Sequence, residues 1–414
     1  MVPIALFANA LGYKKREPAM QSKTAPGSLA DERARRYIFL ACPWGAKGGG
    51  MFKVADYLIQ SQESTFTVHS AELVSLDTRG DASALSSLWV LTKALLRIVR
   101  GRASGRLAGV HVNMAERLSL LRKGAIVVAC KLLGIPVVLH LHAAQLHAFF
   151  PQLPRPLRAL TRWVFTLPEC CIVLGTAAEN FVIEQLRVPK SRVEIVINGV
   201  PAPTVPRRNR SAGAVHRLLF VGNLFERKGV TDLLNAVALP GLKDLHIELV
   251  FAGGGDVQAY TAKSAALGLE KRVRFVGWST QKEVARLMAQ ADILVLPSYD
   301  EGLPLVILEA LANGVAVVCS PVGEIPSLLR HDVSACFVQP GDVNGLSATL
   351  QRVLEQPSLM NLLERNGKTL YLEKFSMPQF FSSIARIHAR SFGVSGQCAL
   401  SVPAKQMTGA NPHD

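Results

Sequence analysis

Acidic residues are scarce in this sequence relative to basic ones. There are 31 Asp and Glu against 46 Lys and Arg, which gives a formal net charge of +15 and a pI near 9.7. An excess of this size predicts attraction to an anionic partner, such as nucleic acid, acidic lipid or a phosphorylated substrate. No basic-aromatic recognition motif accompanies the charge, so nucleic acid is not an expected partner.

The sequence also lacks paired cysteines. The seven cysteines include no Cys-x2-Cys pair, and Cys170 and Cys171 are adjacent in a predicted strand, where neighbouring side chains point to opposite faces. An odd number at these spacings argues against a disulfide framework and a zinc site, and predicts reduced thiols in a cytosolic compartment. No Asp-x-Asp motif follows a predicted strand, so we expect no metal site.

Apolar runs long enough to cross a bilayer are missing as well. Residues 2–11 are mainly apolar, but about ten residues are too few to span a membrane, and Lys14–Arg16 follow them in the wrong order for a secretory signal. Residues 125–141 are interrupted by Lys131, Gly134 and Pro136. We therefore predict no transmembrane segment and a cytoplasmic location.

What is present is a strand-helix alternation that occurs twice. A chain of 414 residues with 49% hydrophobic and 19% charged residues suits a globular protein of two domains, each of ~180 residues. Strands are predicted at 37–42, 66–74, 110–113, 137–142, 171–174 and 193–197, then at 216–222, 247–251, 273–276, 293–296, 315–319 and 335–338. Strands that alternate with helices predict two doubly wound, Rossmann-like α/β domains with a cleft between them.

A polar, basic stretch separates the two alternations. We divide the chain into a flexible extension at 1–35, a first domain at 36–199, a linker at 200–214, a second domain at 215–375, a last helix at 376–392 and a flexible tail at 393–414.

The stretch from Ser298 to Gly314 is the most informative. It lies between two apolar runs that read as buried parallel strands, and it predicts a loop followed by a helix that begins near Pro304 and ends at Gly314. Ligands of such sheets bind beyond the carboxyl ends of the strands. The free amides of Gly302 and Leu303 at the helix start suit an anionic group such as phosphate.

Two carboxylates flank this helix start. Glu301 and Glu309 are eight residues apart, too far to act as one acid/base pair, but each could accept hydrogen bonds from hydroxyls on either side of a bound diphosphate. The alternative is that Glu301 caps a loop and Glu309 is a solvated helix residue.

The pattern Glu301-x7-Glu309, with Gly302, Pro304 and residues 310–318, resembles the signature of the retaining glycosyltransferases of family 4 (group 1). The resemblance covers roughly Tyr37 to Arg390. It implies the GT-B fold, with two Rossmann-like domains facing across a cleft and the last helix crossing back to the first domain. It also implies a nucleoside diphosphate sugar as donor, with no cofactor and no divalent cation.

The resemblance assigns roles in the second domain, where Glu301 would hold the transferred sugar and Glu309 the ribose. Lys228 matches the family lysine that meets the diphosphate, but Asn223 stands where the family has an arginine, and Arg227 is the candidate to compensate. Gly253 belongs to a glycine turn near the nucleotide, and the backbone of Gly277 and Trp278 would meet the base. The Trp278 ring would stack on the base or pack against the protein.

In the first domain, the resemblance points to the loop after the first strand and to a strand-end histidine. Gly48 and Gly49 would lie nearest the phosphates or the acceptor. His140 and His142 are expected on opposite faces of their strand, with His142 facing the donor sugar and His147 a weaker candidate. The alternative for His142 is a structural hydrogen bonder.

Basic residues cluster in the first domain, in the sets Arg155, Arg158 and Arg162 beside Trp163; Arg97, Arg100, Arg102 and Arg106; and Arg117, Arg122 and Lys123. Basic helices with an aromatic neighbour predict peripheral contact with an anionic membrane at its inner face. The alternative is an ordinary solvated basic surface.

These observations predict a retaining hexosyltransferase, with Glu301, His142 and Lys228 as its catalytic residues. The predicted acceptor is a lipid-linked glycan of bacterial envelope or exopolysaccharide biosynthesis. Two alternatives stay open: another GT-B reaction (sugar-nucleotide epimerase or phosphorylase), or a catalytically inactive partner protein, which Asn223 would permit.

Overall fold

The computed structural model describes residues 35–45, 49–62, 68–69, 71–80, 84–143, 145–210, 215–394 and 396–397. Nearly all of the predicted extension at 1–35 and most of the predicted tail at 393–414 lie outside these described residues. The same holds for Gly48, the loop residue predicted to approach the phosphates or the acceptor.

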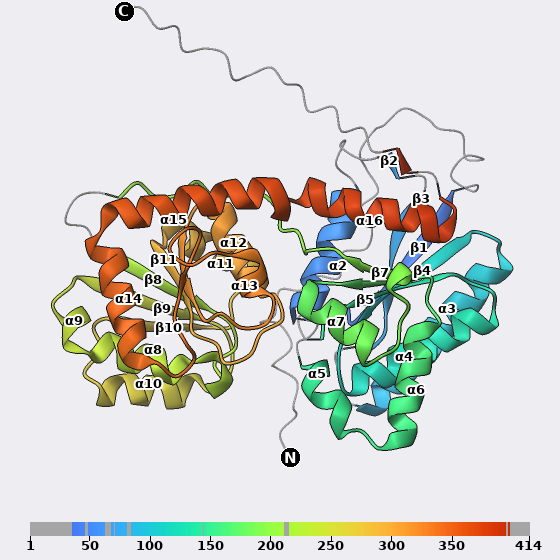
Figure 1. Ribbon diagram of the computed structural model, residues 1–414, viewed down its shortest axis with the longest axis horizontal. Coiled ribbons are helices and arrows are strands. Elements are labelled where there is room, and N and C mark those ends of the chain that lie inside the picture. Colours follow the sequence, from blue (N-terminus) through green and yellow to red (C-terminus); the bar gives the residue numbers. More distant parts are fainter. Residues whose placement is uncertain are drawn as a thin grey trace, which may run out of the picture. The chain divides into compact units, whose positions relative to one another are not determined.

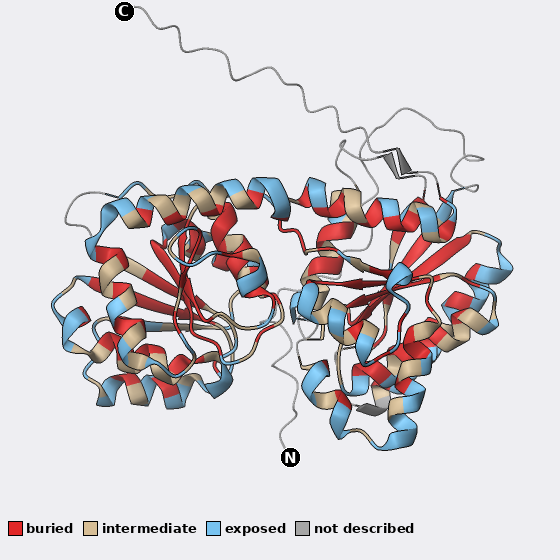
Figure 2. Cartoon of the chain, viewed as in Figure 1, coloured by how far each residue is buried: buried red, intermediate tan, exposed pale blue. Residues whose placement is uncertain are grey.

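The first alternation folds into a six-stranded parallel sheet with the strand order β3-β1-β4-β5-β6-β7 (Figure 1). Its strands are β1 (Arg36–Cys42), β3 (Ala71–Asp77), β4 (Leu107–Met114), β5 (Val137–Leu141), β6 (Cys170–Val173) and β7 (Val193–Ile195). Strands β4, β5 and β6 are buried along their whole length (Figure 2), because helices cover both faces of the sheet. Cys170 and Cys171 enter different core clusters, so they do point to opposite faces.

The helices of this domain are α2 (Gly49–Ser61), α3 (Ala84–Ala103), α4 (Leu118–Leu132), α5 (Leu146–Phe149), α6 (Arg155–Thr166) and α7 (Thr176–Glu184). Helix α4 contacts β4 and both of its neighbours, α3 and α6. The predicted strand at 66–74 is two strands instead: β2 (Val68–His69), which pairs antiparallel with β14 (Gly396–Gln397), and β3.

The second alternation forms another six-stranded parallel sheet, with the order β10-β9-β8-β11-β12-β13. Its strands are β8 (His216–Val221), β9 (Ile247–Ala252), β10 (Val273–Gly277), β11 (Ile293–Leu296), β12 (Ala316–Cys319) and β13 (Cys336–Phe337). Its helices are α8 (Val230–Ala238), α9 (Pro240–Lys243), α10 (Val257–Ala266), α11 (Gln281–Gln290), α12 (Leu305–Asn313), α13 (Ile325–Leu328), α14 (Val343–Glu355) and α15 (Pro357–Leu370). The two predicted Rossmann-like domains are therefore present.

Helix α16 (Met377–Phe392), which follows the second sheet in sequence, packs on the first domain, where it contacts α2 and β5. A one-turn π-helix at Tyr371–Phe375 joins it to α15. Gly109 of β4 allows a close approach, since a Cβ atom there would lie 2.3 Å from Phe392 Cδ1. The C-terminal helix is thus part of the first domain's core.

Each sheet has one topological switch point, because later strands are added on both sides of its first strand. In the second sheet, β9 and β10 add on one side of β8, whereas β11 to β13 add on the other. In the first, β3 lies on one side of β1 and β4 to β7 lie on the other. The loops that follow β8 and β11 separate there, so the carboxyl ends of these two strands are the expected ligand site of the second domain.

Candidate functional site

The switch point of the second sheet brings together a lysine and a glutamate that are 73 residues apart. Lys228 ends a 3-10 turn after β8, and Glu301 follows β11. The Lys228 ammonium donates to Glu301 Oε1, and Ser298 Oγ donates to the same oxygen at 2.9 Å. Glu301 is only 8% exposed, so this carboxylate is a held, largely desolvated acceptor and not a solvated loop cap.

Gly229 makes that meeting possible. Its φ of 69° lies in the left-handed region, and a Cβ atom would sit 2.1 Å from the Pro297 carbonyl oxygen. Only glycine allows the turn to approach the end of β11 so closely. Lys228, the preceding residue, is thereby brought beside Glu301.

Helix α12 begins and ends as predicted, with Pro304 as its N-cap residue and Gly314 in the left-handed conformation at its C-terminus. Among the described residues, the amides of Gly302 and Leu303 have no hydrogen-bond acceptor. The first domain reaches this helix start, since a Cβ atom on Gly50 would lie 3.7 Å from Leu305 Cδ1. Gly49, beside it, has a φ of 58° and open space where a side chain would be.

The remaining predicted donor residues line the carboxyl ends of β8, β9 and β10. A Cβ atom on Gly253 would lie 1.8 Å from the Gly222 carbonyl oxygen, so the turns after β8 and β9 are in contact, and Asn223 is exposed next to them. Gly277 ends β10, and its carbonyl accepts from the Gly253 amide at 2.8 Å. Trp278 is 58% exposed, so more than half of its side-chain surface is accessible to solvent at this edge of the sheet.

Arg227 lies at the same place, four residues after the position where the resemblance expects an arginine. Its side chain is exposed, and its Nη1 is 3.4 Å from the carbonyl oxygen of Asp300. Its own carbonyl accepts from the Tyr299 amide at 2.9 Å. The guanidinium therefore lies beside the loop that carries Glu301.

Residues of both domains line one cavity of about 580 Å³. The second domain contributes Asp300, Glu301 and Gly302, and the first contributes His142 and His147. We refer to it as the interdomain cavity. The predicted sugar-binding carboxylate and the predicted first-domain histidine therefore face the same space.

His142 is held by a residue that the sequence did not single out. Its Nε2 donates to Oδ1 of Asn113, a fully buried residue of β4, at 2.8 Å. The expectation that His140 and His142 lie on opposite faces was wrong: their ring centroids are 4.0 Å apart, because residues two apart on a strand share a face. Removal from water and the nearby Lys123 charge lower the pKa of His142 to about 3, so its ring is neutral.

Behind His142 lies a row of buried imidazoles. His140 Nδ1 is 3.3 Å from His111 Nε2, and His111 Nδ1 is 2.8 Å from Nε2 of His388 on α16. Burial lowers the pKa of His111 to about 3 and that of His140 well below its usual range. A row of four histidines, from His388 through His111 and His140 to His142, thus connects α16 to the interdomain cavity.

The position of Lys123 contradicts a second expectation, that this residue lies on the surface. It was grouped with Arg117 and Arg122 in a basic surface set, but it is fully buried, and its ammonium donates to the Met51 thioether at 3.3 Å. Burial lowers its pKa to about 7. This side of α4 faces inward, towards the carboxyl ends of the first sheet.

Glu309 lies at a different cavity from Glu301. Its Oε1 accepts from the Tyr57 hydroxyl at 3.2 Å and pairs with Lys53 at 3.3 Å, both from α2. The cavity there has a volume of about 280 Å³ and is also lined by Gln281. Burial and the Glu309 charge raise the pKa of Tyr57, so its hydroxyl stays a donor.

Two further carboxylates of the second domain bind first-domain donors, and neither was predicted. Glu324 accepts from the Ala178 amide in the first turn of α7 at 2.9 Å, and Asp300 accepts from Gln145 at 2.7 Å. Glu324 lies in a loop after β12, at the same edge of the sheet as Glu301. Its position after a strand was the one available signal, but its partner is 146 residues away in sequence.

Within the residues that the structure describes, no group of three or more His, Cys, Asp or Glu side chains is arranged to hold a metal ion. Six cysteines are described, and all are buried and unpaired. None of the described helices is both long and apolar enough to cross a membrane.

Comparisons with known proteins match this arrangement. Residues 204–370 match the family "Glycosyl transferases group 1". The glycogen synthase of Mycobacterium tuberculosis is 28% identical over 264 residues, which cover 61% of this chain and 63% of that protein, so less than two thirds of its length is spanned. The UDP-Gal:alpha-D-GlcNAc-diphosphoundecaprenol alpha-1,3-galactosyltransferase of Escherichia coli is 22% identical over 342 residues, covering 78% of this chain and 83% of that protein.

Among solved structures, HepE of Anabaena in complex with UDP and glucose superimposes with a TM-score of 0.66 at 17% identity, covering 85% of this chain and 99% of that one. At this identity the likeness speaks for the fold alone. The predicted GT-B fold is confirmed.

Proposed function

We propose that this chain, whose residues 204–370 form a group 1 glycosyltransferase domain, is a retaining enzyme of family 4 that moves a sugar from a nucleoside diphosphate to an acceptor hydroxyl. One observation carries the proposal. Lys228 and Glu301 meet at the switch point of the second sheet, beside the two free amides at the start of α12, and Glu301 shares a cavity with His142.

The donor is proposed to bind along this edge of the second sheet. Its diphosphate would lie on the amides of Gly302 and Leu303, with Lys228 and Arg227 as counter-charges. Lys228 now pairs with Glu301, so diphosphate entry would exchange one anion for another and free the carboxylate for the sugar hydroxyls.

The nucleoside would extend away from that point. Gly253, Gly277 and Trp278 would meet the base, and Glu309 would accept from the ribose hydroxyls. Because Tyr57 and Lys53 occupy Glu309 at present, the ribose would share or displace these two donors.

Transfer with retention is proposed to proceed on one face of the sugar. The acceptor oxygen forms a bond to the anomeric carbon while the bond from that carbon to the diphosphate oxygen breaks, and the leaving phosphate takes the acceptor's proton. No protein nucleophile is required. Lys228, Arg227 and the α12 amides would stabilise the charge on the leaving group, so we propose no divalent cation and no cofactor. Neutral His142, oriented by Asn113, would position the sugar.

Arg227 bears on the alternative of an inactive partner protein. That alternative arises from Asn223, which leaves one diphosphate cation unaccounted for. The Arg227 guanidinium lies beside the carbonyl of Asp300, next to the proposed diphosphate position, which favours compensation over loss of activity.

We further propose a lipid-linked glycan as the acceptor, in bacterial envelope or exopolysaccharide biosynthesis, with the enzyme acting from the cytoplasm at the inner face of the membrane. The E. coli relative supports this, since its name gives a diphosphoundecaprenol-linked acceptor. The basic excess of the chain supports an anionic partner.

The substitution Glu301→Gln tests the assignment. Removing the carboxylate charge while keeping the shape should lower transfer by about a hundredfold, because the charged acceptor aimed at the sugar is lost. UDP or GDP should still raise the thermal midpoint, since the diphosphate contacts remain. Glu270→Gln, at an exposed position of the same domain, is the matched control. Unchanged turnover in the Glu301 variant would refute the role.

Product analysis with labelled UDP- and GDP-sugars separates the rival activities. Glycoside formation supports the proposal, a free sugar phosphate indicates a phosphorylase, and an epimerised sugar indicates an epimerase. Absence of even slow donor hydrolysis would favour the inactive partner.

A further inference from the structure

Three neighbouring helices of the first domain have an unusual composition. Helices α3, α4 and α6 have 20, 15 and 12 residues, contain four, three and three basic residues, and carry no Asp or Glu. Two of the basic residues of α4 are not available at the surface, because Lys123 is buried and Lys131 pairs with Glu169. At the chain's overall frequency of 31 acidic residues in 414, about three or four would be expected in helices of this combined length. Because α4 contacts both α3 and α6, the three helices form one continuous surface.

The same helices expose many apolar side chains. Ten of the 17 exposed large apolar side chains among the described residues lie on them. On α4 and α6 these are Leu118, Leu121, Leu132, Leu157, Leu160 and Trp163, with Leu132 83% exposed. Monomeric soluble proteins rarely expose contiguous apolar patches of this kind without an interaction that uses them.

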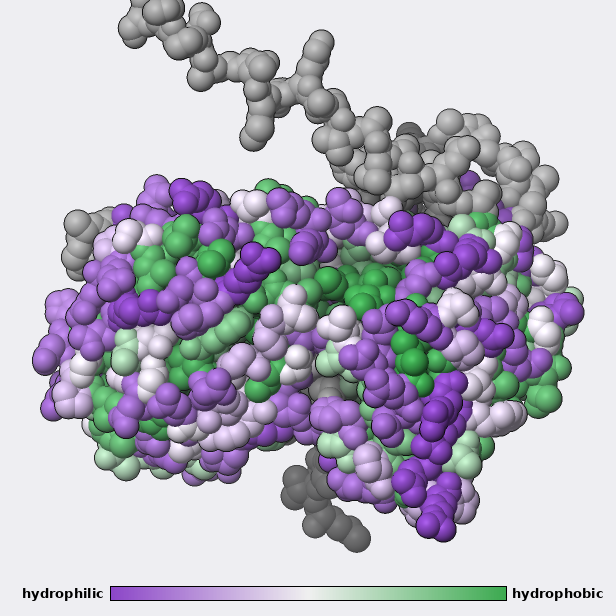
Figure 3. Space-filling model, in the orientation of Figure 1, coloured by the Kyte–Doolittle hydropathy of each residue, from purple (hydrophilic) through white to green (hydrophobic). Residues whose placement is uncertain are grey.

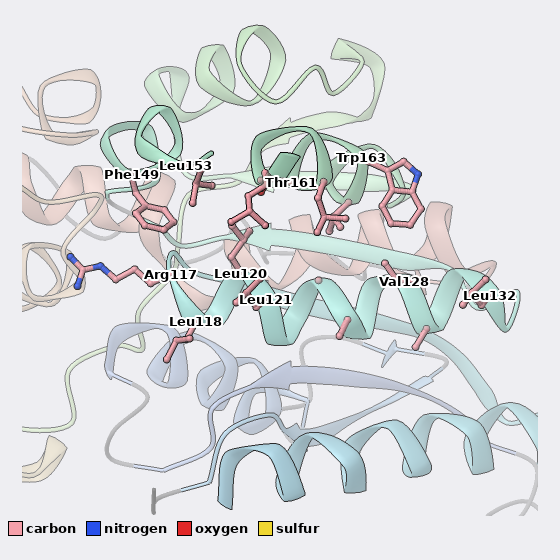
Figure 4. A pocket seen from close by; sticks show the side chains of 16 residues that line it. Arg117, Leu118, Leu120, Leu121, Val128, Leu132, Phe149, Leu153, Thr161 and Trp163 are labelled. Carbon is pink, nitrogen blue, oxygen red and sulfur yellow. The ribbon is translucent and has the colours of Figure 1, made fainter. Parts of the chain in front are cut away.

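An apolar groove of about 760 Å³ runs along α4 and α6. Figure 4 shows Leu120, Val128 and Thr161 along it, Trp163 and Leu132 at one end, and Arg117 at the other. In Figure 3, hydrophilic and apolar surfaces lie side by side on the first domain. The groove is therefore apolar along its length, with one basic residue, Arg117, at one end.

On α6 the two kinds of side chain are separated. Arg155, Arg158 and Arg162 are spaced three and four residues apart and share one face, whereas Leu157 and Leu160 lie towards the groove. A helix with basic residues on one face and Leu and Trp on the other lies in the plane of a membrane interface.

We propose that the surface formed by α3, α4 and α6 docks on an anionic lipid bilayer, with the groove leucines and Trp163 entering the headgroup-acyl boundary and the arginines meeting lipid phosphates. The charge of this surface favours a lipid bilayer over a protein partner. A protein partner would be expected to find some acidic counterpart for its own cations on so large a surface, whereas an anionic bilayer requires cations alone. The inference deepens the proposed function and rests on its placement of the enzyme at the inner face of the membrane: it names the surface that meets the lipid.

Vesicle sedimentation of the full chain tests the proposal. The protein should sediment with vesicles of phosphatidylcholine and phosphatidylglycerol, not with phosphatidylcholine alone, and 0.5 M salt should weaken the binding. Each near-surface basic residue contributes roughly a factor of five, so Arg100→Gln, Arg117→Gln and Arg155→Gln together should lower the partition coefficient about a hundredfold. These three positions are exposed, one at or beside each helix.

The matched control is the triple variant Lys243→Gln, Lys271→Gln and Arg286→Gln. It makes the same change in net charge at exposed positions of the second domain, and should bind vesicles within about threefold of the parent chain. An equal loss in both triple variants would show attraction by net charge alone and would overturn the assignment to this surface.

The contribution of the apolar side chains to vesicle binding can be measured separately. Trp163, 49% exposed, and Trp89 of α3, 59% exposed, should shift their fluorescence to shorter wavelength on vesicle binding, and Trp163→Phe should remove the contribution of Trp163 to that shift. Leu118→Ser with Leu121→Ser should abolish the binding that persists in high salt. Equal binding to neutral vesicles, or a lipid-free dimer that the leucine variant converts to monomer, would overturn the proposal; the second result would assign the surface to self-association.

Thermal shift with UDP and GDP, measured without vesicles, should be unchanged in every docking variant. A chain that binds nucleotide but not lipid refutes docking alone, and one that binds lipid but not nucleotide refutes only the proposed function.

Discussion

Lys123 is a fully buried cation whose one hydrogen-bond acceptor among the described residues is a thioether 3.3 Å away. Burial lowers its pKa from 10.5 to about 7. Each pKa unit corresponds to about 1.36 kcal/mol, so keeping the protonated lysine in the folded chain costs about 5 kcal/mol. Substituting Met, which has a similar length and no charge, should therefore stabilise the protein.

The stabilisation expected from Lys123→Met depends on pH. Between about pH 7 and pH 10.5, the unfolded chain holds a proton that the folded chain has released, so the stability of the parent protein rises with pH through this window. Below pH 7 both states are protonated and the full cost applies. The gain from Lys123→Met should accordingly be about 4 kcal/mol at pH 7 and only about 2 kcal/mol at pH 9.

Denaturant unfolding followed by circular dichroism, at both pH values, measures this difference. Lys131→Met is the control from the same helix: Lys131 is partly exposed and pairs with Glu169 at 2.7 Å, so the change should destabilise by no more than about 1 kcal/mol. A destabilising Lys123→Met, or a gain of equal size at pH 7 and pH 9, would show that the ammonium is not held in a low-dielectric site.

Three shorter predictions follow from other contacts. Arg227→Gln should lower kcat/KM for the donor about tenfold, as expected for one lost charged hydrogen bond, and adding Asn223→Arg should restore it; an unaffected single variant would mean that Arg227 does not compensate. Gly229→Ala should lower the stability of the protein by several kcal/mol more than Gly268→Ala. Both glycines have a φ of 69°, but only at Gly229 would the added Cβ atom lie 2.1 Å from a carbonyl oxygen. Equal thermal midpoints of the two variants would contradict this close approach. The pKa of His111 is lowered from 6.5 to about 3, so as pH falls this residue binds a proton in the unfolded chain before it does so in the folded chain. The protein should therefore lose about 2 kcal/mol of stability between pH 6.5 and pH 5 through this residue. His111→Asn should remove that loss in acid titrations followed by circular dichroism.

Local signals sufficed for the architecture. Apolar runs bounded by glycine and proline located most strands of both sheets, because strands buried on both faces are apolar throughout. The exception is β3, where buried and exposed residues alternate and the prediction at 66–74 missed the break between β2 and β3. Pro304 and Gly314 marked the two ends of α12, because the fixed φ of proline and the left-handed conformation of glycine act within a few residues. The strand order of the second sheet then places the loops after β8 and β11 at one edge, where Lys228 and Glu301 meet.

Other features depended on contacts between distant segments. Lys123 occupies one of three neighbouring basic positions, and nothing in its immediate sequence distinguishes a buried lysine from its exposed neighbour Arg117. The His111–His388 contact joins residues 277 positions apart, and Glu324 meets Ala178 across 146. The order of residue types in the sequence does not show which residues so far apart come into contact.

The sequence by itself thus determined which segments become strands and helices, where α12 begins, and which residue types stand at the strand ends, since these follow from backbone geometry and hydrophobic periodicity over short spans. Only the tertiary structure decided which cations are buried, which carboxylates of the second domain bind first-domain donors, and that three acid-free helices share one exposed surface. Burial and charge pairing depend on what the rest of the chain brings within a few ångströms, and that is a property of the folded molecule.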